Sequence, residues 1–413
     1  MTKFTRKDVL IGLGATTVAA VPATATATAT AAVARHGRAA KPLAIAMWDF
    51  SWLERRWPGA GYEDWDVALK ELVDRGYDAV RIDAYPHLVA ADGTREWTLK
   101  PVWNNQDWGA PTLTRVVVLP ALTQFIARCR AHGVRVALST WFREDKENVR
   151  QRIKTPNALA DIWRQTLRAI ERAGLIDTIV YVDFCNEWPG PIWATFLDPP
   201  LQWGAWRDPR SLTWMRGAIA SLRPHYPDMP LLFSGTAGEI ADYASGDASM
   251  MDACEYHIWM ANGNHNEFAK AVGYKGDRFS EDGYHNLQLK AYDVYTARAS
   301  YWRKSLTDQI AAAAAASRTA RLPMITTECW GIVDYKDWPL LRWDWVKELC
   351  VLGTLEASKT GRWLAIATSN FCGPQFQGMW RDVAWHRALT RAIKAGPVDP
   401  ALQSGRLWAQ LRS

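Results

Sequence analysis

After residue 40, short apolar segments alternate with amphipathic stretches at a fairly regular interval. In stretches such as residues 64–75, 119–132 and 157–173, leucine, isoleucine and valine recur at spacings of three and four, which is typical of helices with one buried face. Gly76, Gly133 and Gly174 stand where these three helices should end. The alternation predicts repeated βα units. Eight strands are expected, at residues 43–49, 79–83, 135–139, 178–183, 230–234, 253–258, 323–327 and 362–368.

The number of units distinguishes between two α/β folds. A doubly wound open sheet also alternates strands and helices, but eight units match a closed barrel, and no Gly-x-Gly-x-x-Gly follows a strand. We therefore predict a (β/α)8 TIM barrel that forms a single domain over residues 41–413. The longest break, from about residue 262 to 321, predicts an insertion between strands six and seven.

The first 40 residues differ in composition from the rest. Thr5-Arg6-Lys7 precedes an apolar stretch over residues 9–21 and an alternating Ala/Thr tract, and Ala32-Val33-Ala34 precedes Arg35. A basic region, an apolar region and a small-residue cleavage site are typical of an export signal, so we expect a periplasmic or secreted protein. The basic pair resembles a twin-arginine signal with lysine in the second place. An uncleaved membrane anchor is the alternative.

Composition argues against several classes of partner. The 49 basic residues are mixed among 43 acidic ones, without a Lys/Arg block, so we expect no nucleic-acid partner. No stretch after residue 40 is long and apolar enough to span a bilayer, so no stable membrane span is expected after signal cleavage. The six cysteines form no Cys-x-x-Cys and the eight histidines no His-x-His, so we expect neither a metal nor another cofactor. Buried free thiols are the favoured state of the cysteines, with one or two disulfides as the alternative.

Two glutamates follow runs that have the character of buried strands. Glu187 follows the run 179–186, which ends in Asn186, and Glu328 follows the run 322–327. A carboxylate is costly at the mouth of an apolar strand, so two of them suggest an acid, a base or a nucleophile. Strands four and seven lie on opposite sides of a barrel opening, where such enzymes carry their reactive groups. The carboxyls can therefore converge on one bond, and glycoside hydrolysis is the chemistry that most often needs two.

These motifs resemble those of the clan A glycoside hydrolases, and most closely their cellulase-like, family-five-like branch. The resemblance rests on Asn186-Glu187-Trp188-Pro189-Gly190 after strand four, Thr327-Glu328-Cys329-Trp330-Gly331 after strand seven and the eight βα units. It implies a retaining hydrolase of β-linked, or stereochemically equivalent, bonds in an oligo- or polysaccharide. Glu187 would be the acid/base and Glu328 the nucleophile.

The same resemblance implies supporting roles for three residues. Arg81 on strand two would hydrogen-bond the nucleophile, and a salt bridge with Asp83 is the alternative. Asn186 would hold the 2-hydroxyl of the sugar. His257 stands where cellulase-like enzymes often have His-x-Tyr, but Trp259 occupies the third position here, and strand eight lacks the tryptophan that is frequent there.

Residues at the strand ends are candidates for substrate binding. Tryptophan, of which the chain has 24, offers a flat apolar face to a sugar ring and an N–H to a hydroxyl. Core packing is the competing explanation for any one of them. The candidates are Trp48, Asp49, Asp83, His87, Trp141, Trp188, Trp259, Trp330 and Asn370.

Two other functions are compatible with these residues. One is a non-catalytic barrel that binds carbohydrate without hydrolysing it, although the presence of both glutamates, Asn186 and Arg81 argues against it. The other is an exo-acting glycosidase on an unusual sugar such as an arabinoside.

Overall fold

The computed structural model describes residues 40–102, 112–236, 247–274, 281–333, 335 and 341–412. The export signal predicted over residues 1–40 lies outside this part of the chain except for its last residue. The signal and the domain boundary at residue 40 therefore stay predictions. Among the described residues, no helix has the apolar length needed to cross a lipid bilayer.

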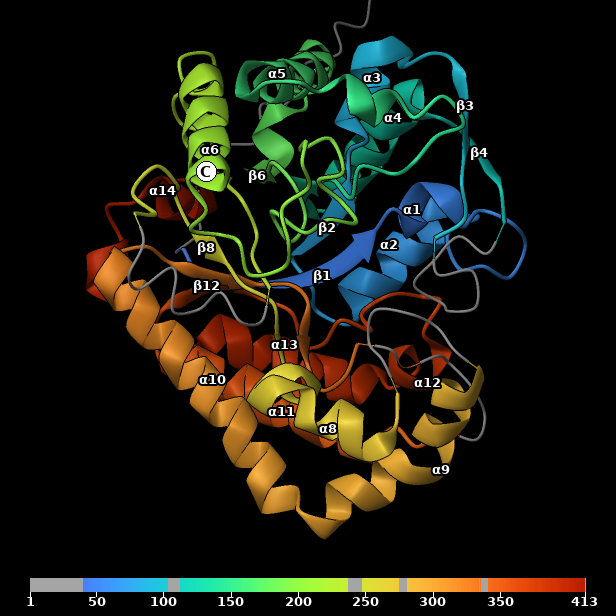
Figure 1. The fold of residues 1–413 in the computed structure, drawn as a ribbon, viewed down its shortest axis with the longest axis vertical. Helices are drawn as coiled ribbons and strands as arrows, with labels where there is room; N and C mark the ends of the chain where they lie inside the picture. The colour runs from blue at the N-terminus through green and yellow to red at the C-terminus, as the bar shows by residue number, and fades with distance from the viewer. Residues whose placement is uncertain are drawn as a thin grey trace, which may run out of the picture. The chain divides into compact units, whose positions relative to one another are not determined.

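Eight parallel strands form the barrel that the sequence predicted (Figure 1). Their order around the sheet is β7-β6-β5-β2-β1-β12-β10-β8, and a parallel bridge between Gly235 and Tyr256 joins the two edges. Each predicted segment contains one strand, although β7 and β8 have only two residues each. The strands are β1 (Leu43–Asp49), β2 (Ala79–Asp83), β5 (Arg135–Ser139), β6 (Ile179–Asp183), β7 (Leu231–Leu232), β8 (Cys254–Glu255), β10 (Met324–Thr326) and β12 (Trp363–Ile366).

Amphipathic helices surround the barrel and end where the sequence places glycine. Gly76, Gly133 and Gly174 follow the three predicted helices and have φ values of 84°, 71° and 70°. Glycine adopts this left-handed conformation without steric cost, so these residues end the helices. In Figure 1, α5 and α6 lie on one side of β1, and α10, α11 and α13 lie on the other. The longer helices of the ring are α2 (Trp65–Asp74), α4 (Val118–Ala131), α5 (Pro156–Arg172), α6 (Pro209–Leu222), α10 (Ala299–Ala320), α11 (Asp344–Lys359) and α13 (Val383–Ala395).

The predicted insertion between strands six and seven is helical. It forms α8 (Gly263–Val272) and α9 (Glu281–Ala297) before the barrel helix α10. Phe268 of α8 packs against Trp302 of α10 and Trp345 of α11, with ring centroids 5.2 and 5.6 Å away. The described part of the insertion therefore lies against the outer helices.

Several shorter elements were not predicted. An antiparallel hairpin separates β2 from α4 and consists of β3 (Glu96–Leu99) and β4 (Thr114–Val117). Four short helices lie outside the predicted βα units. They are α1 (Ser51–Glu54), α3 (Pro86–Asp92), α12 (Gln377–Trp380) and the C-terminal α14 (Arg406–Arg412).

Strands six and seven resume beyond the barrel and form a small ladder of their own. β9 (Ile258–Trp259) follows β8, β11 (Cys329–Trp330) follows β10, and the two pair in parallel. His257 and Glu328 lie in the breaks between each barrel strand and its extension. Regular structure on both sides therefore fixes these two residues at the C-terminal end of the barrel.

All six cysteines are buried, and none of them is bonded to another within the described chain. Burial raises the pKa of the Cys129 and Cys254 thiols above its usual value. A thiol that stays protonated is a poor nucleophile. The preference for buried free thiols over disulfides is confirmed.

Candidate active site

Glu187 and Glu328 converge at the C-terminal opening of the barrel. One carboxylate oxygen of each, together with one ring nitrogen of His257, lie within 4.8 Å of one another. The two carboxyl side chains are 13% and 10% exposed, so both are mostly buried but open to solvent. The convergence expected from strands four and seven is confirmed.

A tight turn after β6 presents Glu187. Glu187 has a φ of 49°, which is uncommon for a residue other than glycine. Its backbone N–H donates to Ser234 Oγ at 2.9 Å, and the N–H of Gly190 donates to its carbonyl oxygen at 2.6 Å. Such a conformation persists only where the surroundings hold it, and here the chain beyond β7 does so.

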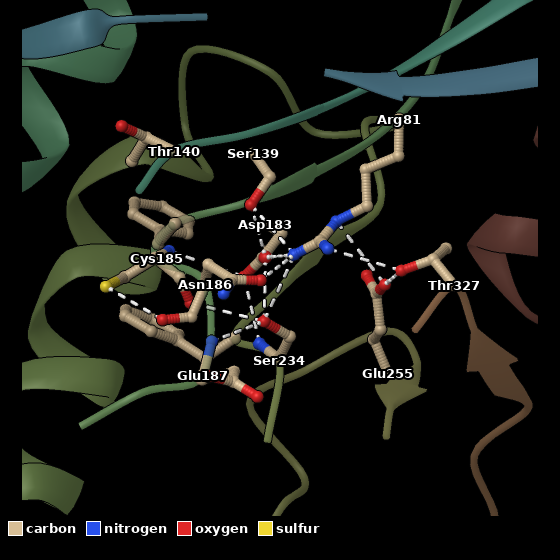
Figure 2. A network of polar contacts seen from close by, with 12 residues as sticks. Arg81, Ser139, Thr140, Asp183, Cys185, Asn186, Glu187, Ser234, Glu255 and Thr327 are labelled. Atoms are coloured by element: carbon tan, nitrogen blue, oxygen red, sulfur yellow. Dashed lines mark hydrogen bonds and ion pairs between the residues drawn. The ribbon is translucent and has the colours of Figure 1, made fainter. Parts of the chain in front are cut away.

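Arg81 links the two glutamate segments from inside the barrel (Figure 2). Its Nη1 donates to Glu328 Oε1 and Thr327 Oγ1, both at 3.2 Å. Its Nη2 donates to Asp183 Oδ2 and Asn186 Oδ1, both at 2.7 Å. The contact with Glu328 expected for Arg81 is present. Because Asn186 turns its oxygen to the guanidinium, its amide NH2 faces elsewhere, and its role towards a sugar hydroxyl stays a prediction.

The charge of Arg81 is secured by buried carboxylates. Glu255 Oε1 lies 3.4 Å from Arg81 Nε, and the side chains of Arg81, Glu255 and Asp183 have no exposed surface. Burial disfavours the guanidinium cation, but Glu255 and Asp183 outweigh it and raise the pKa of Arg81 above its usual value. Arg81 is therefore a permanent cation behind both glutamates.

His257 lies between the two glutamates and carries a proton. Its Nδ1 is 3.1 Å from Glu187 Oε1 and 3.7 Å from Glu328 Oε2. Burial disfavours the imidazolium, but Glu328, Glu187 and Glu255 outweigh it and raise the pKa of His257 to about 10. His257 is therefore a cation at neutral pH that neutralises part of the charge on both carboxyls.

Trp193 contacts Glu187 on its other oxygen. Its Nε1 donates to Glu187 Oε2 at 3.4 Å, and only 3% of the residue is exposed. Oε1 of Glu187 therefore faces His257, whereas Oε2 faces the loop after strand four. Sequence reasoning missed Trp193 because it looked at strand ends, and Trp193 lies six residues beyond Glu187. The only available signal was its place in the short aromatic stretch that begins at Trp188.

Carboxyl groups outnumber cations in this cluster. Burial raises the pKa of Glu328 to about 7, and Glu187 adds to the rise against the opposing charges of His257 and Arg81. Carboxyls this close to one another disfavour full ionisation, so the cluster retains a proton near neutral pH. Four carboxyls face two cations, namely Asp183, Glu187, Glu255 and Glu328 against Arg81 and His257.

The same three side chains have the spacing of a possible metal site. One ligand atom each from Glu187, His257 and Glu328 falls within 4.8 Å. A metal ligand must be a neutral imidazole, whereas the pKa of His257 is raised to about 10, and Arg81 already compensates Glu328. In this charge state the imidazolium of His257 has no lone pair to offer a cation.

Three of the five tryptophans predicted to bind sugar pack outside the barrel instead. Trp48, Trp188 and Trp330 are fully buried. Each indole N–H is already used by the protein, so neither a ring face nor a donor is left for a substrate, and the prediction is wrong for these three. The N–H of Trp48 donates to Cys372 O at 3.0 Å, that of Trp188 to Ser211 Oγ at 2.9 Å, and that of Trp330 to Ala367 O at 3.0 Å.

Trp141 and Trp259 lie beside the charged cluster. The Trp141 ring centroid is 4.7 Å from Arg81 Cζ, and Trp259 meets the His257 ring edge to face at 5.7 Å. Trp259 Nε1 is buried and has no hydrogen-bond partner within the described ranges. The structure thus leaves the substrate-binding role of both residues a prediction.

The carboxylate of Asp83 accepts hydrogen bonds from two backbone N–H groups and is not available to a substrate. It is fully buried, its Oδ1 accepts the Tyr85 N–H at 2.7 Å, and its Oδ2 accepts the Trp141 N–H at 2.9 Å. Burial raises the pKa of Asp83 to about 7. Both oxygens are occupied, so neither the predicted contact with a sugar hydroxyl nor the alternative salt bridge with Arg81 is correct.

Asp49, His87 and Asn370 are buried but each keeps one polar atom without a partner in the part of the chain that the structure describes. These atoms are Asp49 Oδ2, His87 Nδ1 and Asn370 Oδ1. Burial raises the pKa of Asp49 and lowers that of His87 to about 3, which keeps the His87 ring neutral. Their contact with a substrate stays a prediction.

Comparisons with known proteins cover the whole barrel. Residues 45–394 match the family of sugar-binding cellulase-like proteins. A candidate glycoside hydrolase from Parabacteroides distasonis ATCC 8503 is 52% identical, with a TM-score of 0.88 over 90% of this chain and 99% of that one. GH5_18 from Bifidobacterium longum subsp. longum shares the fold at 12% identity, with a TM-score of 0.50 over 87% of this chain and 81% of that one. No match was found among curated proteins. The chain therefore belongs to the sugar-binding cellulase-like family, and its relatives support a glycosidase with a (β/α)8 barrel.

Proposed function

We propose that this protein is a retaining glycoside hydrolase that cleaves β-linked, or stereochemically equivalent, bonds of an oligo- or polysaccharide. The observation that carries the proposal is the pair of carboxyl oxygens within 4.8 Å. Retaining glycosidases place their carboxyls roughly 5 Å apart, whereas inverting ones need roughly 6.5–9.5 Å to admit a water. The short separation supports double displacement.

The contacts of the two glutamates support different roles. Arg81 donates to Glu328 at 3.2 Å and, as a permanent cation, favours the ionised carboxylate that a nucleophile needs. Glu187 is the more exposed of the two and turns Oε2 towards the loop after strand four, where a leaving group could receive its proton. These differences support Glu328 as nucleophile and Glu187 as acid/base.

The reaction then proceeds in two displacements at the anomeric carbon. In the first, a Glu328 oxygen bonds to this carbon, the bond to the leaving oxygen breaks, and Glu187 donates its proton to that oxygen. In the second, Glu187 takes a proton from water, the water oxygen bonds to the same carbon, and the bond to Glu328 breaks. His257 contacts both carboxyls and stabilises the negative charge that moves between them.

The dependence of the rate on the leaving group separates the two roles. A panel of aryl β-glucosides, β-mannosides, β-galactosides and arabinosides first identifies the sugar. Glu187→Gln should then slow cleavage of phenyl glycosides by roughly 10²- to 10⁴-fold but spare the first step with 2,4-dinitrophenyl glycosides, because that leaving group departs without a proton. Glu328→Gln should abolish cleavage of both. Glu96→Gln, at an exposed glutamate of β3, is the matched control and should change neither.

Three outcomes would count against the assignment. Wild-type rates in Glu328→Gln would discard the nucleophile, and equal effects of Glu187→Gln on both leaving groups would discard the acid role. A wild-type protein that binds oligosaccharide but hydrolyses no member of the panel would instead be the non-catalytic carbohydrate-binding barrel.

We further propose that the protein is exported. The basic, apolar and small-residue regions before Arg35 support this proposal. Expressed with its full N-terminus in a bacterial host, the protein should be recovered outside the cytoplasm with its first residue near Arg35. N-terminal sequencing of intact Met1 on protein confined to the cytoplasm would contradict it.

A further inference from the structure

Glu255 is a buried carboxylate that forms no bond in the two displacements. It belongs to β8, and its side chain has no exposed surface. A carboxylate without access to water is costly unless cations and hydrogen-bond donors compensate it. Its Oε1 lies 3.4 Å from Arg81 Nε and 3.9 Å from His257 Nε2. Burial disfavours the anion, but Arg81 and His257 outweigh it and hold the pKa of Glu255 below its usual value, so Glu255 is ionised at neutral pH.

The same oxygen holds the residue that precedes the nucleophile (Figure 2). The hydroxyl of Thr327 donates to Glu255 Oε1, and Thr327 Oγ1 accepts a hydrogen bond from Arg81 Nη1 at 3.2 Å. Arg81 comes from β2, Thr327 from the end of β10 and His257 from the end of β8. Arg81 and His257 contact Glu328, and Thr327 is its neighbour in sequence. Three residues therefore connect Glu255 to the nucleophile.

The two ring nitrogens of His257 face different carboxylates. Nδ1 lies 3.1 Å from Glu187 Oε1 and 3.7 Å from Glu328 Oε2, whereas Nε2 lies on the side of Glu255. The proposed reaction changes the charge of the first two. Glu328 loses its charge when it bonds to the sugar, and Glu187 gains one when it gives up its proton. Of these three carboxylates, only Glu255 keeps the same charge throughout.

Two groups of β6 also face Glu255 in the barrel interior. Burial raises the pKa of Tyr181 well above its usual value, and Glu255 adds to the rise, so the phenol stays neutral. Asp183 is paired with the guanidinium of Arg81, with Oδ2 2.7 Å from Nη2. Neither group therefore replaces the charge of Glu255 beside His257.

We propose that Glu255 is a positioning residue that supplies the constant counter-charge of His257 during both displacements and anchors Thr327 at the end of β10. This role rests on the proposed function and adds a residue to it. At each stage only one of Glu187 and Glu328 is ionised, so the buried imidazolium needs a second anion, and Glu255 provides it. A neutral His257 would leave the charge that moves between the two glutamates uncompensated.

The first test follows the charge of His257 and needs no substrate. The nitrogen resonances of the His257 ring, identified by their loss in His257→Gln, report its pKa, which is raised to about 10 in the wild type. Glu255→Gln keeps the shape but removes the charge, so this pKa should fall by roughly 1 to 3. Glu255→Asp, which draws the charge back by one methylene, should lower it less. Glu54→Gln is the matched control, because Glu54 is equally buried in an ion pair with Arg143, and it should leave the pKa of His257 unchanged.

The second test asks whether this charge serves the reaction. It uses 2,4-dinitrophenyl glycosides of the identified sugar, because their leaving group departs without a proton and the first step then does not depend on Glu187 as an acid. In the wild type kcat/KM should stay level up to a pH of about 10. In Glu255→Gln it should fall roughly tenfold as the pH rises through the lowered pKa of His257.

A folded Glu255→Gln variant in which His257 titrates as in the wild type would overturn the inference and leave the proposed function intact. A lowered pKa of His257 with an unchanged pH profile of kcat/KM would do the same. If only Glu255→Asp folds, an unchanged pKa of His257 in that variant would overturn it. No hydrolysis of any panel member by the wild type would reject the proposed function and the role of Glu255 in it, whereas the titration of His257 would still report which carboxylate holds its charge.

Discussion

Replacing Arg81 by lysine removes a bridge but keeps the charge. The guanidinium uses Nη1 for Glu328 and Thr327 and Nη2 for Asp183 and Asn186. Lysine has a single nitrogen and cannot serve both pairs at once. We expect the ammonium to stay with the fully buried Asp183 and to lose Glu328.

The expected loss follows from one contact. A hydrogen bond to a charged group contributes about 1.5–3 kcal/mol, and about 1.4 kcal/mol corresponds to a factor of ten, so kcat/KM should fall roughly ten- to hundredfold. Arg81 is also one of two cations that oppose the rise in the pKa of Glu328, which burial brings to about 7. Weakening it should raise this pKa further.

The assay is the pH dependence of kcat/KM on an aryl glycoside. In the wild type the rate should fall as the pH drops below about 7, because protonated Glu328 cannot attack. In Arg81→Lys the fall should begin at higher pH. Arg115→Lys, at an exposed arginine 3.8 Å from Glu96, is the matched control, and thermal unfolding is followed for both variants. A folded Arg81→Lys variant within twofold of the wild type, with an unmoved acid limb, would refute the reasoning.

Three further predictions concern stability. Burial lowers the pKa of His386 to about 3, so the stability that the neutral ring contributes is complete above the unfolded pKa of about 6.5 and is lost as the pH falls towards 3. Between pH 7 and pH 5 the unfolding free energy of the wild type, measured in urea, should therefore fall by about 2 kcal/mol relative to that of His386→Gln. A difference between the two proteins that does not change with pH would contradict this. Trp48→Ala should cost about 3–5 kcal/mol of unfolding free energy and leave KM unchanged, whereas Trp57→Ala, at a 41% exposed site, should cost little; a raised KM in Trp48→Ala would restore its role as a sugar platform. Asp83→Asn should cost about 1–3 kcal/mol because the amide can accept only one of the two backbone N–H groups, and an equally stable variant would show that these bonds matter little.

The fold was predictable because its signals are local. Strands buried on both faces appear as continuous apolar runs, and Gly76, Gly133 and Gly174 end helices through their own backbone conformation. The hairpin β3–β4 was missed because it interrupts the βα rhythm without changing the number of barrel strands. The insertion was predicted from its length alone, and its packing against α10 and α11 depends on contacts distant in sequence.

The site was predictable only in part because strand-end residues can face either way. Arg81 pairs in register with Met47, so Met47 faces the interior and its neighbour Trp48 faces the helices. The sequence could not give this register, and it therefore placed Trp48 at the opening. Trp193 was missed for the opposite reason, since the folding of a loop brings it to Glu187.

The central claim is that Glu328 becomes covalently bonded to the sugar while Glu187 transfers the protons. The most direct measurement is to trap this intermediate with a 2,4-dinitrophenyl 2-deoxy-2-fluoroglycoside of the identified sugar and to locate the adduct by mass spectrometry of the digested protein. We predict one sugar per chain, on the peptide that contains Glu328, and release of product with retained configuration when the adduct turns over. A sugar attached to Glu187, or a first product of inverted configuration without any adduct, would contradict the account.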